Sequence, residues 1–255
     1  MKNEQVSYQI DDKTFNGYLT FPSSKGQTTQ RRPAIIIAPA WMGQDQFARH
    51  KADVLAELGY IGFAADLYGE GKTASNSEEA QSLMLPLFED RALLQKRIRA
   101  AYEVLRQHPA VDPSNIGAIG FCFGGLTVIE LLRNGADVKG VVSFHGVLGN
   151  TMGDIHAKTV PIAKAIKGSL LILHGYEDPL VSQQDLSNMQ KEMSGAHVDW
   201  QLNIYSHTSH AFTNPEQQDK EHGLLFNPLS SERAWWVMIH FFSERFGLER
   251  KLEAY

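Results

Sequence analysis

The feature that most constrains the fold is the hexapeptide Gly-Phe-Cys-Phe-Gly-Gly at residues 120–125, which contains Cys122, the only cysteine of the chain. The short run at 115–119 before it predicts a buried strand, and residues 126–133 after it carry apolar side chains at helical spacing. A strand that turns directly into a helix strains the residue at the bend and projects its side chain clear of the sheet, while glycines permit close packing. The hexapeptide therefore predicts a nucleophile elbow with a thiol at its tip.

A second interpretation of Cys122 is structural, because a lone cysteine is commonly a small buried core residue. The strand before the glycine bracket and the helix after it favour the functional interpretation. The bend also directs free N–H groups toward the helix N-terminus, where developing negative charge is stabilised.

Segments of strand and helix character alternate along most of the 255 residues. This alternation predicts an α/β fold in one domain, residues 1–255, with a mostly parallel central sheet, helices on both faces and an N-terminal antiparallel hairpin. A polar surface loop is expected at residues 23–32. The hairpin is predicted at 6–10 and 14–21; the other strands at 34–38, 61–66, 116–120, 138–144, 170–174 and 200–205; and the helices at 47–58, 78–107 with a break or kink at Pro86, 126–133, 183–193 and from about residue 230.

Composition excludes several classes of function. The net charge of −5 gives no reason to expect nucleic acid or an anionic membrane as a partner. A single cysteine cannot form an intramolecular disulfide. The N-terminal residues lack the apolar stretch of a secretion signal, and no run approaches the length of a membrane span, so we expect a cytoplasmic protein.

A catalytic thiol needs a neighbouring base or cation, because an unperturbed thiol is only a few per cent thiolate at neutral pH. Ligand sites of parallel sheets form at the carboxyl ends of strands, so the partners of Cys122 are expected in loops there. Residues 175–179, Gly-Tyr-Glu-Asp-Pro, offer an acid, and residues 206–212 offer a histidine. The order nucleophile, acid, histidine is that of the α/β-hydrolase arrangement.

Each of these loops contains two candidates. Glu177 and Asp178 compete for the role of the acid, and Asp178 is preferred because Pro179 fixes the turn directly after it. His207 and His210 compete for the role of the base. The spacing of the two histidines also suggests a metal site, but zinc needs a third ligand and none lies at an informative spacing, so we expect no metal.

Four motifs together resemble the dienelactone hydrolase family of the α/β-hydrolase superfamily. The resemblance implies a hydrolase of carboxylic esters or lactones without a cofactor, in which Cys122 is the nucleophile, His210 rather than His207 the base, and Asp178 the carboxylate that orients it. The motifs are Gly-Phe-Cys-Phe-Gly-Gly at 120–125, Gly-Tyr-Glu-Asp-Pro at 175–179, His-Ala-Phe at 210–212 and Ala-Ala-Asp-Leu-Tyr at 64–68.

The resemblance also implies the mechanism, which is acyl transfer through an acyl-enzyme. The backbone N–H groups of Phe123 and Trp41 would form the oxyanion hole. The aromatic side chains in loops at strand ends are candidate walls of the substrate pocket, and residues 70–89 are a candidate flap over it. The substrate-binding candidates are Tyr68, His145 and Phe212, together with Trp41.

Two positions depart from the type members of the family. Ala40 stands where they carry a glutamate, and Asn214 stands where they carry an arginine that holds the substrate carboxylate. An amide does not replace the bidentate fork of a guanidinium, and Arg91 is the remaining candidate for a positive charge. We therefore expect a small neutral ester as substrate rather than an anionic dienelactone.

Two other functions stay open from the sequence. The same acyl-cysteine could transfer its acyl group to an acceptor other than water, which would make the protein an acyltransferase. A non-catalytic binding member of the fold is the third possibility, although it would have no physical need for a cysteine, an aspartate and a histidine in this order. The oligomeric state is left open.

Overall fold

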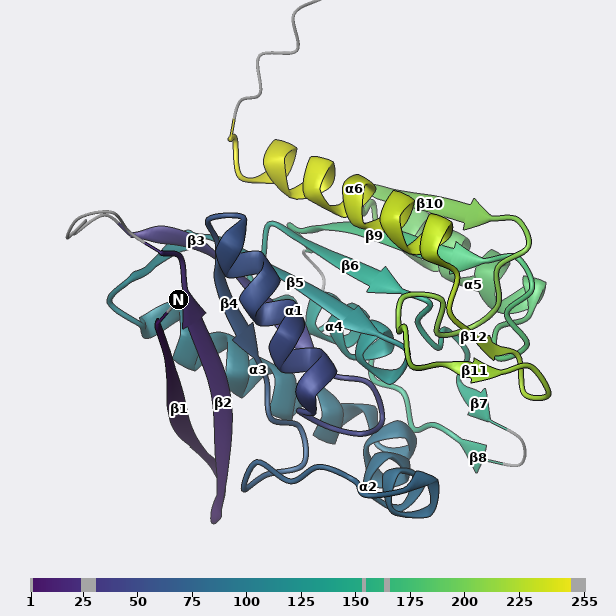
Figure 1. Cartoon of the computed structure of the whole chain (residues 1–255), viewed down its shortest axis with the longest axis horizontal. Helices are drawn as coiled ribbons and strands as arrows, with labels where there is room; N and C mark the ends of the chain where they lie inside the picture. The colour runs from purple at the N-terminus through teal and green to yellow at the C-terminus, as the bar shows by residue number, and fades with distance from the viewer. Residues whose placement is uncertain (1, 24–30, 153–154, 163–165, 249–255) are drawn as a thin grey trace, which may run out of the picture.

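The computed structural model describes residues 2–23, 31–152, 155–162 and 166–248. An eight-stranded sheet in the order β1-β2-β4-β3-β5-β6-β9-β10 forms its centre (Figure 1). The strands from β4 to β10 in this order run parallel, whereas β1 and β2 form an antiparallel hairpin that joins β4 in antiparallel register. The strands are β1 (Lys2–Ile10), β2 (Lys13–Phe21), β3 (Arg32–Ala38), β4 (Ile61–Ala64), β5 (Val111–Phe121), β6 (Gly140–Phe144), β9 (Ser169–Gly175) and β10 (Trp200–Tyr205).

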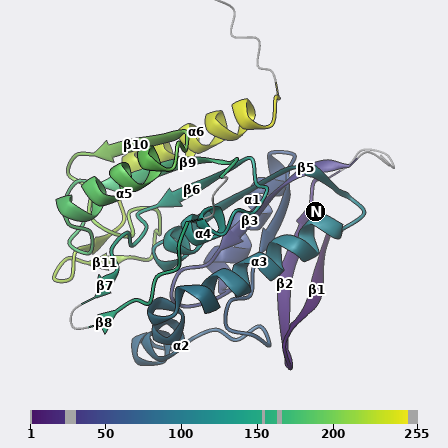
Figure 2. The same ribbon diagram turned by 180° about the vertical axis from the view of Figure 1, so that it is seen from behind.

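Helices cover both faces of this sheet (Figures 1 and 2). The helices α1 (Gln46–Glu57) and α6 (Pro228–Arg245) bury apolar side chains in the core layer on one face. The helices α2 (Ser77–Glu89), α3 (Arg91–Gln107), α4 (Phe123–Arg133) and α5 (Gln183–Gly195) pack into the layer on the other face. The predicted α/β architecture is confirmed, including the N-terminal hairpin.

The helical stretch after β4 differs in one respect from the prediction. Its break lies at Asp90 rather than at Pro86, which is inside α2. Asp90 has extended backbone geometry, and its side chain accepts a hydrogen bond from the backbone N–H of Leu93, so it caps α3. The capping carboxylate therefore ends one helix and starts the next.

Two short ribbons were not predicted from the sequence. The first consists of β7 (Thr151–Met152) and β8 (Ile155–His156), and the second of β11 (Gln218–Asp219) and β12 (Leu224–Leu225). Most of the loop predicted at 23–32 lies outside the described residues. In the part of the chain that the structure covers, no helix combines the length and the apolar character that crossing a bilayer requires.

The strand register brings the candidate loops together at one edge of the sheet. Ala38 of β3 is paired with Gly120 of β5, so the loops that follow these two strands lie side by side. In the same way, Tyr205 of β10 is paired with Gly175 of β9, which brings the loop with the acid next to the loop with the histidine.

Candidate active site

Cys122 lies at the bend between β5 and α4 with φ of 55° and ψ of −116°. This positive φ is rarely adopted by residues with a side chain, and it marks a strained elbow. The flanking glycines are required sterically: a Cβ on Gly120 would collide with the carbonyl oxygen of Gly124, and one on Gly124 would collide with that of Ala38. The thiol of Cys122 is half-buried.

The loop after β3 carries Trp41 and is held by hydrogen bonds from the segment after β4. The hydroxyl of Tyr68 donates to the carbonyl oxygen of Trp41 at 2.7 Å, and the N–H of Ala74 donates to the carbonyl of Met42 at 2.9 Å. Gly43 has φ of 86° and forms a bridge with Thr73. Hydrogen bonds from Tyr68 and Ala74 therefore fix the backbone at Trp41 and Met42.

Asp66 organises the turn that carries Tyr68. Its buried carboxylate accepts hydrogen bonds from the backbone N–H groups of Tyr68 at 3.0 Å, Gly69 at 2.7 Å and Gly71 at 2.8 Å, and from Asn16 at 3.0 Å. Burial, together with the nearby Cys122, raises the pKa of Tyr68. Tyr68 is thus a neutral hydrogen-bond donor close to the thiol, and its hydroxyl donates to the carbonyl of Trp41.

Phe123 is the first residue of α4, directly after the elbow residue Cys122, and its N–H is one of the N-terminal amides that a helix leaves without an internal partner. Within the described residues, neither this N–H nor that of Trp41 donates a hydrogen bond to another group. The two predicted oxyanion donors therefore come from neighbouring segments, the loop after β3 and the first turn of α4, and within the described residues both remain available to a ligand.

Asp178 follows β9 and is buried. One carboxylate oxygen accepts the N–H of Leu180 at 2.9 Å, and the other lies 2.7 Å from Nδ1 of His210. The loops approach closely at Gly175, where a Cβ would collide with the carbonyl oxygen of Thr208. The turn thus fixes one oxygen of Asp178 and directs the other at the histidine.

His210 is held in place by backbone contacts with the second ribbon. Its N–H donates to the carbonyl of Gly223, and its carbonyl accepts from Leu225, both at 3.0 Å. Its side chain is 1% exposed, and Nε2 has no hydrogen-bond partner of standard geometry in the described part of the chain. Burial disfavours its protonation, but Cys122 and Asp178 outweigh burial and raise the pKa of His210 to about 10.

The rejected candidates of the two loops form a separate pair at the surface. His207 Nδ1 lies 3.4 Å from Glu177 Oε1, and both side chains are exposed. Proximity therefore assigns Asp178 to His210 and Glu177 to His207. An exposed pair of this kind contributes little stability because water screens it.

Behind His210 lies a buried histidine, His145, that was predicted to contact substrate. Its ring packs edge-on against that of His210 at 5.1 Å, and its Nε2 lies 2.8 Å from the hydroxyl of Thr213. Burial first, and then the charge of His210, lower the pKa of His145 well below its ordinary value. His145 is therefore a neutral side chain that supports the ring of His210.

Phe212 was also predicted to line the substrate pocket. It is fully buried and packs edge-on against His145 at 5.2 Å, within the core layer under α1 and α6. Its position is that of a core residue behind the site rather than a wall open to substrate.

Thr213 and His174 were not singled out from the sequence. His174 is buried at the end of β9, and its Nδ1 lies 3.9 Å from Asp178 Oδ2. Burial lowers its pKa, so it adds no positive charge next to the carboxylate. The signal that could have found His174 was its position, four residues before Asp178 on a buried strand.

Neither Arg91 nor Asn214 offers a free positive charge to a substrate carboxylate. Arg91 is fully buried, its Nε lies 3.8 Å from Glu130, and its guanidinium stacks over the ring of Phe88 at 4.4 Å. The side chain of Asn214 accepts the N–H of Glu216 at 3.1 Å and so caps its own turn.

The segment 70–89, a candidate flap, is attached at both ends. At its start the N–H of Glu70 donates to the carbonyl of Thr14 at 2.8 Å, and at its end the carbonyl of Glu89 accepts the N–H of Lys158 at 2.5 Å. Between them, α2 buries Leu87 and Phe88 in the core. A flap motion of this segment would have to break these contacts.

Comparison with known proteins gives a consistent result. The chain matches the dienelactone hydrolase family over residues 15–246. It is 28% identical over 244 residues to a probable 2-oxo-3-(5-oxofuran-2-ylidene)propanoate lactonase from Bradyrhizobium, covering 92% of this chain and 93% of that protein. It is 25% identical over 244 residues to a putative carboxymethylenebutenolidase from Aquifex aeolicus, covering 94% and 97%.

Among solved structures, a dienelactone hydrolase-like promiscuous phosphotriesterase from metagenomic libraries superposes with a TM-score of 0.86 at 32% identity. The superposition covers 95% of this chain and 98% of the other. The sequence match and the structural match therefore extend over nearly the whole chain.

Proposed function

The chain belongs to the dienelactone hydrolase family and is thus a hydrolase of ester or lactone bonds, and on this premise we propose that it acts through an acyl-enzyme on Cys122, with His210 and Asp178 as its partners. The observation that carries this proposal is the 2.7 Å contact between His210 Nδ1 and Asp178, in a histidine whose protonation is favoured by Cys122. A thiolate beside an imidazolium is the activated form of a cysteine nucleophile.

In the first half of the reaction, Sγ of Cys122 attacks the carbonyl carbon of the ester. The N–H groups of Trp41 and Phe123 stabilise the resulting oxyanion; loss of one such donor typically costs about 10²–10³ in rate. The C–O bond then breaks, and the leaving alkoxide takes a proton from the imidazolium of His210. A thioester on Cys122 and a neutral His210 remain.

In the second half, His210 changes from acid to base. The thioester sulfur carries no negative charge, so the strongest influence that raised the pKa of His210 is gone, and burial now favours the neutral ring. Neutral His210 takes a proton from water, which attacks the thioester and releases the carboxylic acid. The thiolate leaves, and His210 keeps the proton, which restores the starting pair.

A small neutral ester is the substrate class we propose. The support is that Arg91 is buried against Glu130, while the side chain of Asn214 is engaged in its own turn. A substrate carboxylate would therefore gain no bidentate partner from either position. The Bradyrhizobium relative, by contrast, is named as a probable lactonase of 2-oxo-3-(5-oxofuran-2-ylidene)propanoate, a compound that carries a carboxylate.

The test compares p-nitrophenyl acetate with p-nitrophenyl hemisuccinate, which carries an extra carboxylate, in wild type and Cys122→Ala. We expect wild type to prefer the acetate by about tenfold or more in kcat/KM, and Cys122→Ala to lose essentially all turnover. Wild-type turnover by a well-folded Cys122→Ala would refute the nucleophile, and a preference for the hemisuccinate would refute the substrate class. Product analysis with added methanol or an amine separates hydrolysis from acyl transfer. Release of the free acid alone indicates hydrolysis, whereas a methyl ester or an amide would indicate acyl transfer.

A further inference from the structure

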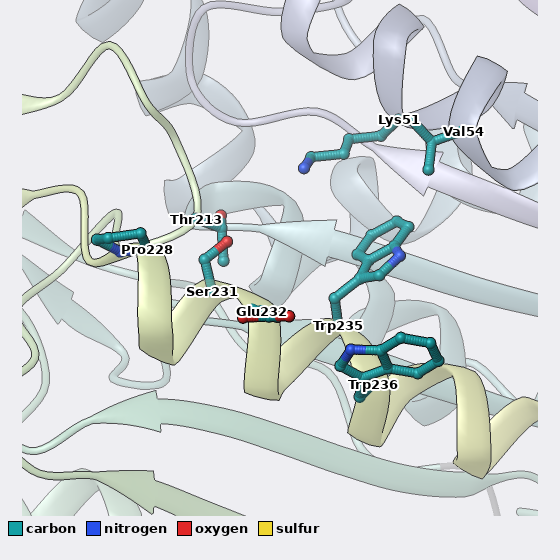
Figure 3. Close-up of a pocket in the computed structure, with 8 residues that line it drawn as sticks. All are labelled: Lys51, Val54, Thr213, Pro228, Ser231, Glu232, Trp235 and Trp236. Atoms are coloured by element: carbon teal, nitrogen blue, oxygen red, sulfur yellow. The ribbon is translucent and has the colours of Figure 1, made fainter.

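A cavity of about 320 Å³ lies between α1 and α6 (Figure 3). This is near the lower end of the sizes, about 300–1,000 Å³, typical of small-molecule sites. Figure 3 shows the ammonium group of Lys51 directed into the cavity from α1, opposite Ser231 and Trp235 of α6. The lining residues that the argument uses are Lys51, Thr213, Ser231, Glu232, Trp235 and Trp236.

Lys51 is a cation that lies among aromatic rings. Its Nζ lies 4.9 Å from the ring centroid of Phe47, 5.0 Å from that of Trp235 and 5.8 Å from that of Phe121. Within the described residues, no carboxylate lies at ion-pair distance from it, and burial lowers its pKa to about 8. Aromatic faces stabilise the ammonium in part, but a desolvated charge gains further from an anion that can reach it.

The aromatic side chains of the cavity provide an apolar surface for the body of such a ligand. Trp235 is partly buried, and Trp236 is 56% exposed, so its indole is accessible to a ligand in the cavity. Ser231 adds a hydroxyl opposite Lys51. Glu232 is exposed at the cavity and disfavours a second negative charge, so a ligand with a single negative charge fits best.

The cavity is separate from the candidate active site. Phe47 and Trp235 belong to the core layer on the α1 and α6 face, whereas Cys122 and Trp41 pack against the layer on the opposite face of the sheet. Two lining residues reach toward the site through His145: the hydroxyl of Thr213 contacts its ring, and the charge of Lys51 contributes to the lowering of its pKa. The ammonium of Lys51 takes part in no step of the chemistry proposed at Cys122, and its link to the site is indirect, through His145.

We propose that this cavity binds a small aromatic monocarboxylate, whose carboxylate pairs with Lys51 Nζ and whose ring packs against Trp235 and Trp236. The carboxylate gives the ammonium an anionic partner, and the ring covers the exposed indole of Trp236. This binding does not depend on Cys122 being a nucleophile.

The test is calorimetric titration of the full-length protein with sodium benzoate, with benzamide as its uncharged analogue. Cys122 is first alkylated with iodoacetamide, so that binding near the thiol does not contribute. We expect one benzoate site, with benzamide at least about tenfold weaker because the charged contact is lost. Absence of benzoate binding, or equal affinity for the two compounds, would overturn the proposal.

Variants locate the site. Lys51→Met keeps the apolar stem and should weaken benzoate at least about tenfold, whereas Lys191→Met, at an exposed position of α5, should leave it unchanged. Trp236→Ala changes an exposed residue and should also weaken binding, which provides the test if Lys51→Met does not fold. Wild-type affinity in a folded Lys51→Met, or in Trp236→Ala, would contradict the assignment.

Discussion

His210 Nδ1 and Asp178 Oδ2 lie 2.7 Å apart, with the two side chains 1% and 0% exposed. A second pair lies in the same two loops: His207, three residues before His210, and Glu177, directly before Asp178. Both side chains are exposed, and His207 Nδ1 and Glu177 Oε1 are 3.4 Å apart. The same two loops thus contain a buried pair next to the elbow cysteine and a solvated pair outside it. This difference provides matched controls for the proposed chemistry.

The first prediction concerns these two pairs. Asp178→Asn should lower kcat/KM by about 10²–10⁴-fold, because the amide no longer favours the productive tautomer of His210 or stabilises its charged form. Glu177→Gln makes the same chemical change in the exposed pair and should alter kcat/KM by less than about twofold. Steady-state kinetics with p-nitrophenyl acetate measure both. Equal effects of the two substitutions would contradict the assignment of Asp178.

The second prediction concerns Tyr68, which we regard as a positioning residue for the Trp41 loop. Tyr68→Phe removes the 2.7 Å hydrogen bond to the carbonyl of Trp41. It should lower kcat by about tenfold with little change in KM, because the N–H of Trp41 shifts slightly from its position as oxyanion donor but is not lost. Tyr18→Phe is the control, because its hydroxyl donates to Asp53 at 2.9 Å outside the site. A change confined to KM would indicate that Tyr68 contacts substrate instead.

The third prediction concerns the protonation of His210. Its pKa is raised to about 10, so its ring should stay an imidazolium as the pH rises past 6.5 and lose its proton only near pH 10. Cys122→Ala removes the largest contribution that raises this pKa, so the ring of that variant should lose its proton at lower pH. Titration of the histidine ring carbons by NMR follows both proteins. Identical titration of His210 in wild type and Cys122→Ala would contradict a thiolate–imidazolium pair.

The fourth prediction concerns the neutral histidine behind the site. The unfolded chain binds a proton at His145 below about pH 6.5, whereas folded His145, with its lowered pKa, does not. The free energy of unfolding should therefore fall as the pH drops below about 6.5, with His145 contributing a slope of roughly 1 kcal/mol per pH unit. Urea denaturation between pH 7.5 and 5 should show a shallower slope for His145→Gln.

The control for this slope is His240→Gln, which changes an exposed histidine on α6. The free energy of unfolding of this variant should depend on pH as that of wild type does. A wild-type slope in His145→Gln as well would mean that His145 is protonated in the folded protein, contrary to its burial.

The part of the site that could be predicted from the sequence is the part fixed by local backbone chemistry. The glycines around Cys122 are required by close contacts that only residues without a Cβ allow, so the elbow was visible as a pattern. The strand runs located the loops of Asp178 and His210, because parallel strands end at one edge of the sheet.

The remainder depends on contacts between distant segments. The ribbon that holds His210 pairs residues of low strand character, and its two strands have two residues each, too short to show a period. Likewise, the bond between Tyr68 and Trp41 and the contact between His145 and Thr213 join residues 27 and 68 positions apart. Pro86 suggested a helix break because of its missing N–H, but the cap at Asp90 determined where the helix ends.

The central claim is that Cys122 carries the acyl group during turnover. Its most direct test is rapid acid quenching of the protein during hydrolysis of p-nitrophenyl acetate, followed by intact-mass measurement and peptide mapping. Our account predicts one added acetyl group, on the peptide with Cys122, which accumulates further in His210→Asn because the base for hydrolysis of the thioester is lost. An acetyl group on another residue, or turnover with no adduct at Cys122 in either protein, would contradict it.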